Sequence, residues 1–251
     1  MSMIKKALAD KKCVDAARQQ TDQYLAQKGV SLHTDKKFLV NAFLLTKVFR
    51  DLMDQAGAAA FTINGCMSTI IPIAQTTACM CLSLINDDGL LAFCESDFVV
   101  IPSGILLHYI SGKPSFLQDP THPHDGVVTI AHCTAPRRMN GRDLEPVEIH
   151  THFESDYGAA PKVNMRKGQM VTNLCPSFTS EKWLGFRGTI IDHPFYDICR
   201  SQVDVEIEGD WRRLLEDMQG FHWMTCYGDY LREVGYALKK VGIKWDNITT
   251  A

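Results

Sequence analysis

The chain has 251 residues, of which 45% are hydrophobic and 22% charged, and its formal net charge is −3. This composition is typical of a globular protein built from one large domain or two moderate ones. The small negative charge gives no electrostatic reason to expect nucleic acid or an anionic membrane surface as a partner.

The cysteines and the apolar runs indicate the expected compartment. The nine cysteines include no CxxC pair. An odd cysteine count, together with an N-terminus that lacks a signal-peptide pattern, predicts free thiols in a reducing, cytoplasmic setting. No apolar run approaches the roughly 18 residues that a membrane-spanning helix needs, so we expect no membrane association.

The first 120 residues alternate between helical and strand patterns. Thr34 is a candidate N-cap, and Gly29 and Gly57 are candidate helix ends. Such alternation favours a parallel or mostly parallel sheet, although the strands are few for a complete doubly wound domain. The predicted helices are 3–28, 35–55, 70–84 and 101–110, and the predicted strands are 58–63, 90–94 and 116–119.

After residue 119 the pattern changes to short β-type runs separated by Gly, Pro, Asn and Asp. Six runs at this spacing predict an antiparallel sheet or a small barrel. Two helices follow, at 210–218 and 229–241, and Gly242 is a candidate end of the second. We therefore predict an α/β region over residues 1–122 and a β-rich domain with a closing helix over 123–251. The six predicted strands are 127–132, 147–153, 163–165, 170–174, 188–191 and 203–207.

Two carboxylates stand at the ends of predicted strands. Glu95 follows strand 90–94, and Asp119 ends strand 116–119 after one predicted crossover helix. In open α/β sheets, the carboxyl ends of neighbouring strands lie together and hold ligands. The pair could share Mn²⁺ or Mg²⁺, or transfer protons. The ordinary alternative is that each acid caps a helix or lies in an exposed loop.

Histidines occur at similar positions. His132 ends strand 127–132, and His222 lies shortly before the last helix. Either could complete a metal site, although a hydrogen-bonded core histidine and a surface loop histidine are the ordinary alternatives. His150 and His152 are two residues apart, so on a strand they would share one face. They could bind metal there, or the face could simply be solvated.

Several catalytic motifs are absent from the sequence. It contains no Gly-rich phosphate loop, no GxGxxG, no GxSxG and no HExxH. Nucleotide-dependent, serine-hydrolase and zinc-protease chemistry are therefore disfavoured. The strand-end acids and histidines favour a metal-assisted proton-transfer enzyme.

Short stretches spread over residues 35–245 carry a family resemblance by their order and spacing. They are Ala60-Phe61-Thr62-Ile63, Thr77-Ala78-Cys79, Ser83-Leu84-Ile85-Asn86-Asp87, Cys94-Glu95-Ser96-Asp97, Ser111-Gly112-Lys113-Pro114, Asp119-Pro120, Ala131-His132-Cys133, Lys167-Gly168-Gln169-Met170-Val171-Thr172, Gly220-Phe221-His222 and Tyr227-Gly228-Asp229. Together they resemble the L-fucose isomerase/L-arabinose isomerase family, and within it the fucose isomerase-like branch.

The resemblance implies a specific chemistry. Enzymes of this family interconvert aldoses and ketoses with a divalent metal, usually Mn²⁺, through a cis-enediol route. It places Glu95 and Asp119 on the family's two metal-binding acids, which also transfer protons. It places His132 and His222 on further metal ligands. A small-molecule sugar is the implied substrate.

Family members are about twice as long as this chain and carry an N-terminal α/β domain ahead of the matching region. We therefore expect the chain to lack that domain. The family also implies a homo-oligomer, trimeric or hexameric. Two main functions remain open at this point, beside another metal-dependent reaction on a polyol or sugar acid. The chain is a metal-dependent sugar isomerase or its catalytic portion, or it is a non-catalytic sugar- or metal-binding module. The latter includes a subunit of a split isomerase that needs a separate N-terminal partner.

Overall fold

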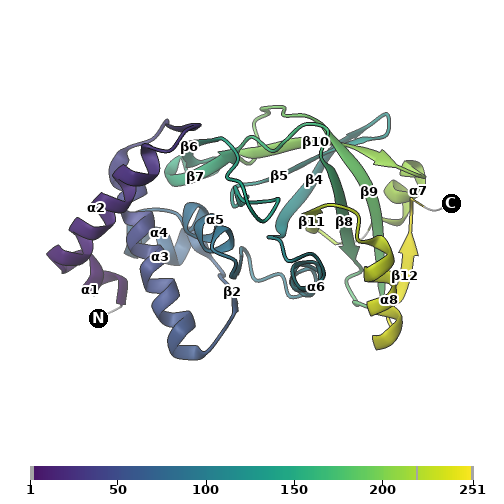
Figure 1. Cartoon of the computed structure of the whole chain (residues 1–251), viewed down its shortest axis with the longest axis horizontal. Coiled ribbons are helices and arrows are strands. Elements are labelled where there is room, and N and C mark those ends of the chain that lie inside the picture. Colours follow the sequence, from purple (N-terminus) through teal and green to yellow (C-terminus); the bar gives the residue numbers. More distant parts are fainter. Residues whose placement is uncertain (1–2, 219, 250–251) are drawn as a thin grey trace.

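The computed structural model describes residues 3–218 and 220–249, with most helices gathered at one end and a strand barrel at the other (Figure 1). Helix α1 and strand β12 lie at opposite ends of the long axis. The first half contains α1 Met3–Ala9, α2 Lys11–Leu25, β1 Val30–Leu32, α3 Lys36–Ala56, β2 Ala60–Thr62, a π-helical segment Cys66–Ile70, α4 Ile71–Ala74, α5 Cys79–Asp87, β3 Leu91–Phe93 and α6 Ile101–Ser111.

The second half is mostly strand. It contains β4 Phe116–His124, β5 Val127–His132, β6 Val147–His152, β7 Tyr157–Val163, β8 Met170–Pro176, β9 Lys182–Asp192, β10 Ser201–Glu208, α7 Trp211–Asp217, β11 Trp223–Tyr227, α8 Leu231–Val241 and β12 Lys244–Asn247. The predicted boundary at residue 122 remains a prediction, and β4 runs across it.

Capping side chains determine where helices α2 and α3 begin. The predicted helix 3–28 is two helices, because the carboxylate of Asp10 accepts a hydrogen bond from the Lys12 N–H (2.9 Å) and starts α2. Thr34 is not the cap of α3. Asp35 has that role and accepts from the Lys37 N–H at 2.9 Å. Gly57, with φ +60°, ends α3 as predicted.

The predicted helix 70–84 is also interrupted. Gln75 adopts a left-handed conformation with φ +53°, which ends α4 and separates it from α5. No single described helix is long and apolar enough to cross a membrane. One pair bent by 89°, Cys66–Ala74 with Cys79–Asp87, passes that test together by length and composition. Nearly all of α5 is buried inside the protein, so it has the character of a core helix.

The predicted small antiparallel barrel is confirmed, with different strands from some of those expected. Six antiparallel strands close on themselves in the order β10-β5-β4-β11-β8-β9, with β9 pairing back to β10. Strand β12 adds to β9 in parallel. The predicted strand 147–153 corresponds to β6, whereas the predicted strand 163–165 shares only Val163 with β7. Strands β6 and β7 form a separate three-stranded sheet with β1.

The predicted parallel α/β sheet is present only as small pieces. Strands β2 and β3 pair in parallel as a two-stranded sheet, and β1 pairs in parallel with β6. After β3, helix α6 leads the chain into β4 of the barrel. The prediction that Glu95 and Asp119 end neighbouring strands of one sheet is therefore wrong. Asp119 lies inside β4, and Glu95 follows β3 in another sheet.

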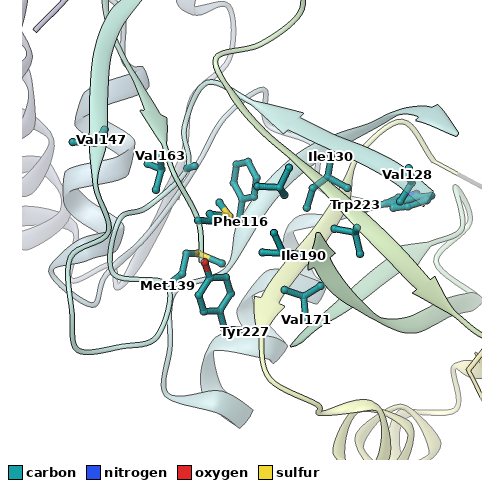
Figure 2. Packing of buried hydrophobic residues seen from close by; sticks show 14 of the residues in the cluster. Phe116, Val128, Ile130, Met139, Val147, Val163, Val171, Ile190, Trp223 and Tyr227 are labelled. Atoms are coloured by element: carbon teal, nitrogen blue, oxygen red, sulfur yellow. The ribbon is translucent and has the colours of Figure 1, made fainter. Parts of the chain in front are cut away.

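The barrel interior is filled by large apolar side chains (Figure 2). Phe116, Ile130, Val171, Ile190 and Trp223 are each at most 1% exposed. Burial of a side chain of this size contributes about 1.5–3 kcal/mol, so this cluster is a main source of barrel stability. A second cluster, which includes Leu91 and Phe93 of β3, Leu107 of α6, Met224 of β11 and Val234 of α8, packs α6 between β3 and the barrel.

Candidate metal centre

A strained turn presents Glu95. After β3, Glu95 and Ser96 both have positive φ angles, 63° and 52°. This conformation costs a non-glycine residue about 1–2 kcal/mol. Thr62, at the end of β2, holds the turn. Its hydroxyl accepts from the Ser96 N–H (3.0 Å) and donates to the Phe93 carbonyl (3.2 Å). The turn brings the Glu95 carboxylate to the histidines of the barrel.

Three neighbouring barrel strands supply the other side chains. Strands β5, β4 and β11 lie side by side in that order. His132 is the last residue of β5, and Asp119 of β4 is opposite Ala131. His222 directly precedes Trp223 of β11, which pairs with Gln118. Asp119, inside β4, therefore lies beside His132 at the end of β5 and His222 just before β11.

The structure brings all four predicted site residues together. Glu95 Oε1 lies 3.5 Å from His132 Nε2, and Glu95 Oε2 lies 3.3 Å from His222 Nε2. Asp119 Oδ1 also lies 3.3 Å from His222 Nε2. The ligand atoms of Asp119, His132 and His222 all fall within 4.8 Å of one another. This spacing suits the coordination of one ion.

Two further residues orient the imidazoles. Asp97 Oδ2 lies 2.8 Å from His222 Nδ1, and Thr134 Oγ1 lies 2.9 Å from His132 Nδ1. Each histidine therefore uses Nδ1 for an orienting contact and turns Nε2 toward the acids. Such outer contacts fix the ring and tautomer of metal-binding histidines. Sequence reasoning missed both residues. Asp97 belongs to the stretch Cys94-Glu95-Ser96-Asp97, but nothing local links it to a partner 125 residues away.

Burial and neighbouring charges shift the pKa values of the site residues. The adjacent imidazoles of His132 and His222 hold the pKa of Glu95 far below its usual value. Burial raises the pKa of Asp119, although the two histidines oppose this. Burial alone would lower the pKa of His222, but the neighbouring carboxylates of Glu95 and Asp97 raise it to about 9. Without a cation, imidazolium protons thus supply the positive charge between the carboxylates.

Two buried atoms indicate that the residues fit a cation. Asp119 Oδ1 and His222 Nε2 are both buried and have no hydrogen-bond partner. Leaving such an atom unpaired costs about 1–3 kcal/mol. The two atoms are 3.3 Å apart, and ligands that share an octahedral ion lie about 3 Å from each other. Carboxylate oxygens with imidazole nitrogens suit a divalent cation, and this donor set does not by itself select one metal.

The site opens into a cavity of about 470 Å³ lined by Glu95, Asp119 and His132. A second cavity of about 350 Å³ shares Asp119, Glu154 and Phe221 with it. Among the described residues, no Lys or Arg lines either cavity. Five thiols line the first one, which sequence reasoning treated only as buried free cysteines: Cys66, Cys79, Cys94, Cys133 and Cys199.

The structure differs from the predicted surroundings of His222, His150 and His152. His222 does not directly precede the last helix, because strand β11 lies between them. His150 and His152 do not share one environment, because the pairing of β6 with β7 shifts register between them. His152 lines the cavity, whereas His150 contacts Glu148.

No family model matches the chain. The chain is 24% identical over 200 residues to a protein named sulfoquinovose isomerase from Clostridium sp. (strain MSTE9). The alignment covers 76% of this chain and 44% of that relative, so the chain spans less than half the length of the curated relative it matches. The similarity points to sugar isomerases in general and does not single out the fucose isomerase-like branch.

Proposed function

We propose that the chain is a metal-dependent aldose–ketose isomerase, or its catalytic portion, acting on an uncharged sugar. The convergence of Glu95, Asp119, His132 and His222, the first three of which line the cavity, carries the proposal. The similarity to a named sugar isomerase supports the reaction class. Mn²⁺ is the proposed ion, and Mg²⁺ is the alternative.

Asp119, His132 and His222 would hold the cation, because they are the more buried donors and converge on one point. A bound divalent cation would polarise the two sugar oxygens next to the reacting carbons. Glu95 is assigned the carbon proton transfer. Its side chain is 49% exposed, whereas that of Asp119 is 21% exposed. Its lowered pKa keeps the carboxylate ionised, the form that a base needs before it takes up a proton.

The proposed isomerisation moves two protons within the sugar. Glu95 takes the proton from C2 of the aldose and returns it to C1, while the hydroxyl proton on O2 moves to O1. The product is the isomeric ketose, and no external proton is consumed. Asp97 and Thr134 position the two imidazoles and touch no reacting atom.

The cavity lining favours a substrate without an anionic group. Its charged members are the acids Glu95, Asp119 and Glu154, and Asp197 lines the adjoining cavity. A sulfonate or phosphate would be repelled there, since it is normally held by Arg, Lys or a helix N-terminus. The relative is named for sulfoquinovose, a sulfonated sugar, so we expect this chain to differ from it in substrate.

The test is Mn²⁺-dependent isomerisation by the full chain across neutral aldoses and sulfoquinovose. We expect turnover of at least one neutral aldose and loss of activity on metal removal. Glu95→Gln should lower kcat by roughly 10²–10⁴, the range for a lost proton-transfer group. Glu206→Gln is the matched control, because Glu206 is exposed on β10 and lines neither cavity.

Activity that survives Glu95→Gln would contradict the assignment of the base. Calorimetry that shows sugar binding without turnover would favour the second function, a binding module or a subunit that needs a separate partner. The 44% coverage of the relative is the observation behind that alternative. Faster turnover of sulfoquinovose than of every neutral aldose would contradict the proposed substrate class.

A further inference from the structure

A second group of metal-ligating side chains lies where β1 meets β6. The two strands pair in parallel, with Ser31 opposite Glu148 and Leu32 opposite Ile149. The chain continues this pairing for one more residue, since the His33 N–H donates to the Ile149 carbonyl at 2.8 Å. His33 is thereby set beside His150, and their rings stack with centroids 4.8 Å apart. None of these residues lines the cavities of the first site.

Glu148 lies beside the two stacked imidazoles, near both Nε2 atoms, and is anchored from one side. Its Oε1 accepts from Lys162 Nζ at 2.5 Å and from Asn164 Nδ2 at 3.4 Å. Its Oε2 lies 3.4 Å from His150 Nε2 and 4.0 Å from His33 Nε2. The carboxylate is therefore held through one oxygen and presents the other to both rings. The three ligand atoms lie within 4.8 Å of one another.

We propose that His33, Glu148 and His150 form a second, structural metal site for a borderline divalent ion of the zinc class. Two imidazole nitrogens and one carboxylate oxygen are a common zinc ligand set, with water as the fourth ligand.

The site needs one adjustment that the structure permits. His33 Nε2 lies 2.9 Å from Ser31 Oγ. Because the two rings are stacked, the nitrogen lone pairs of His33 and His150 lie in parallel planes and do not point at one common position. The His33 side chain is 48% exposed, so its ring can turn toward Glu148 without displacing core atoms. Lys162 offsets part of the carboxylate charge, which makes the site weaker than a closed four-ligand zinc site.

An ion at this position would join His33, just after β1, to β6. Strand β1 connects α2 to α3 and pairs with no strand other than β6 among the described residues. The metal would therefore fasten the N-terminal helices to the three-stranded sheet. Because only the folded chain brings the ligands together, binding should raise the melting temperature.

Zinc stoichiometry of the untagged full chain tests the proposal, measured by equilibrium dialysis. We expect His33→Ala and His150→Ala each to bind one zinc fewer per chain than the parent. His124→Ala is the matched control, because His124 is an exposed histidine of β4 outside both sites. Its zinc count should equal that of the parent.

Thermal denaturation gives a second readout with Glu148→Gln, which keeps the shape of the side chain. Zinc should raise the melting temperature of this variant less than that of the parent. Equal zinc counts in the parent, His33→Ala and His150→Ala would overturn the proposal, since zinc would then be held elsewhere, for example by the cavity thiols. Isomerase assays do not enter this test, so its outcome is independent of the proposed function.

Discussion

Asp97 contacts two neighbours through its two carboxylate oxygens. Oδ1 accepts from the Val99 N–H at 2.9 Å in the turn before α6, and Oδ2 lies 2.8 Å from His222 Nδ1. The first contact shapes the turn, and the second sets the tautomer of a proposed metal ligand. One side chain thus links the Glu95 turn to the barrel.

Asp97→Asn should weaken Mn²⁺ binding by about 10- to 100-fold, the usual cost of losing an outer contact to a ligand. The amide N–H would donate to His222 Nδ1 and move the ring proton to Nε2, which blocks that nitrogen as a ligand. A metal titration followed by calorimetry measures the change. Asp210→Asn, at the N-cap of α7, is the control remote from the site. Unchanged affinity in Asp97→Asn would remove the orienting role.

Asp87 offers a separate test on stability. Burial raises its pKa to about 6 from an ordinary 3.8, although the Arg138 N–H donates to it at 2.7 Å. A carboxyl with a raised folded-state pKa stabilises the fold only while protonated. Its contribution is complete below about pH 4 and is lost as the pH rises through 6.

Asp87→Asn should therefore gain stability over the parent as the pH rises. The gain should grow from near zero at about pH 4 to roughly 2–3 kcal/mol at pH 7, the equivalent of the pKa change. Urea denaturation at several pH values gives the free energy of unfolding. The exposed Asp54→Asn is the control. Parallel pH curves for Asp87→Asn and the parent would contradict the expectation.

The turn between β3 and α6 is the element that carries the most backbone strain near the site. Ser96, with φ +52°, has a side chain while occupying a conformation that suits glycine. Its backbone N–H bonds the Thr62 hydroxyl, and this contact needs no side chain at position 96.

Ser96→Gly should raise the free energy of unfolding by up to about 1 kcal/mol, because it relieves the left-handed strain. Ser96→Ala removes the same hydroxyl but keeps Cβ, so it should give no gain. Denaturant midpoints of the three proteins make the comparison. If the alanine variant gains as much as the glycine variant, strain is not the cause.

Local patterns predicted single elements better than their pairing. The end of α3 at Gly57 and the helix 101–110 follow from short-range signals that the structure confirms. Strand β11 was missed, because its five residues are all buried and show no alternation. Glu95 and Asp119 were correctly expected to lie close together, yet for the wrong reason. No local signal shows that α6 leads from one sheet into another.

For the molecule as a whole, the barrel leaves few free strand edges. Its six strands close, and among the described residues only β12 extends the ring, through β9. A homo-oligomer, trimer or hexamer, therefore stays a prediction from the family resemblance. Size-exclusion chromatography with light scattering measures it, and a mass of 28.2 kDa would show a monomer.

The position of β4 has a consequence for the order of folding. Its neighbour β5 follows it directly, but its other neighbour β11 begins more than 100 residues later, with Trp223 opposite Gln118. Distant pairings of this kind form late, because closing a long loop costs entropy before any contact repays it. His222 thus joins Asp119 and His132 only when the barrel closes.

Mn²⁺ should therefore act on unfolding and leave folding almost untouched. At 100 times its dissociation constant, an ion stabilises the fold by about 2.7 kcal/mol. If the site forms after the folding transition state, this whole stabilisation slows unfolding, by about 100-fold, and leaves the refolding rate unchanged. Stopped-flow kinetics with and without Mn²⁺ measure both rates. Faster refolding with the ion would mean instead that β4 and β11 meet early, and that the ion helps to assemble the barrel it later holds closed.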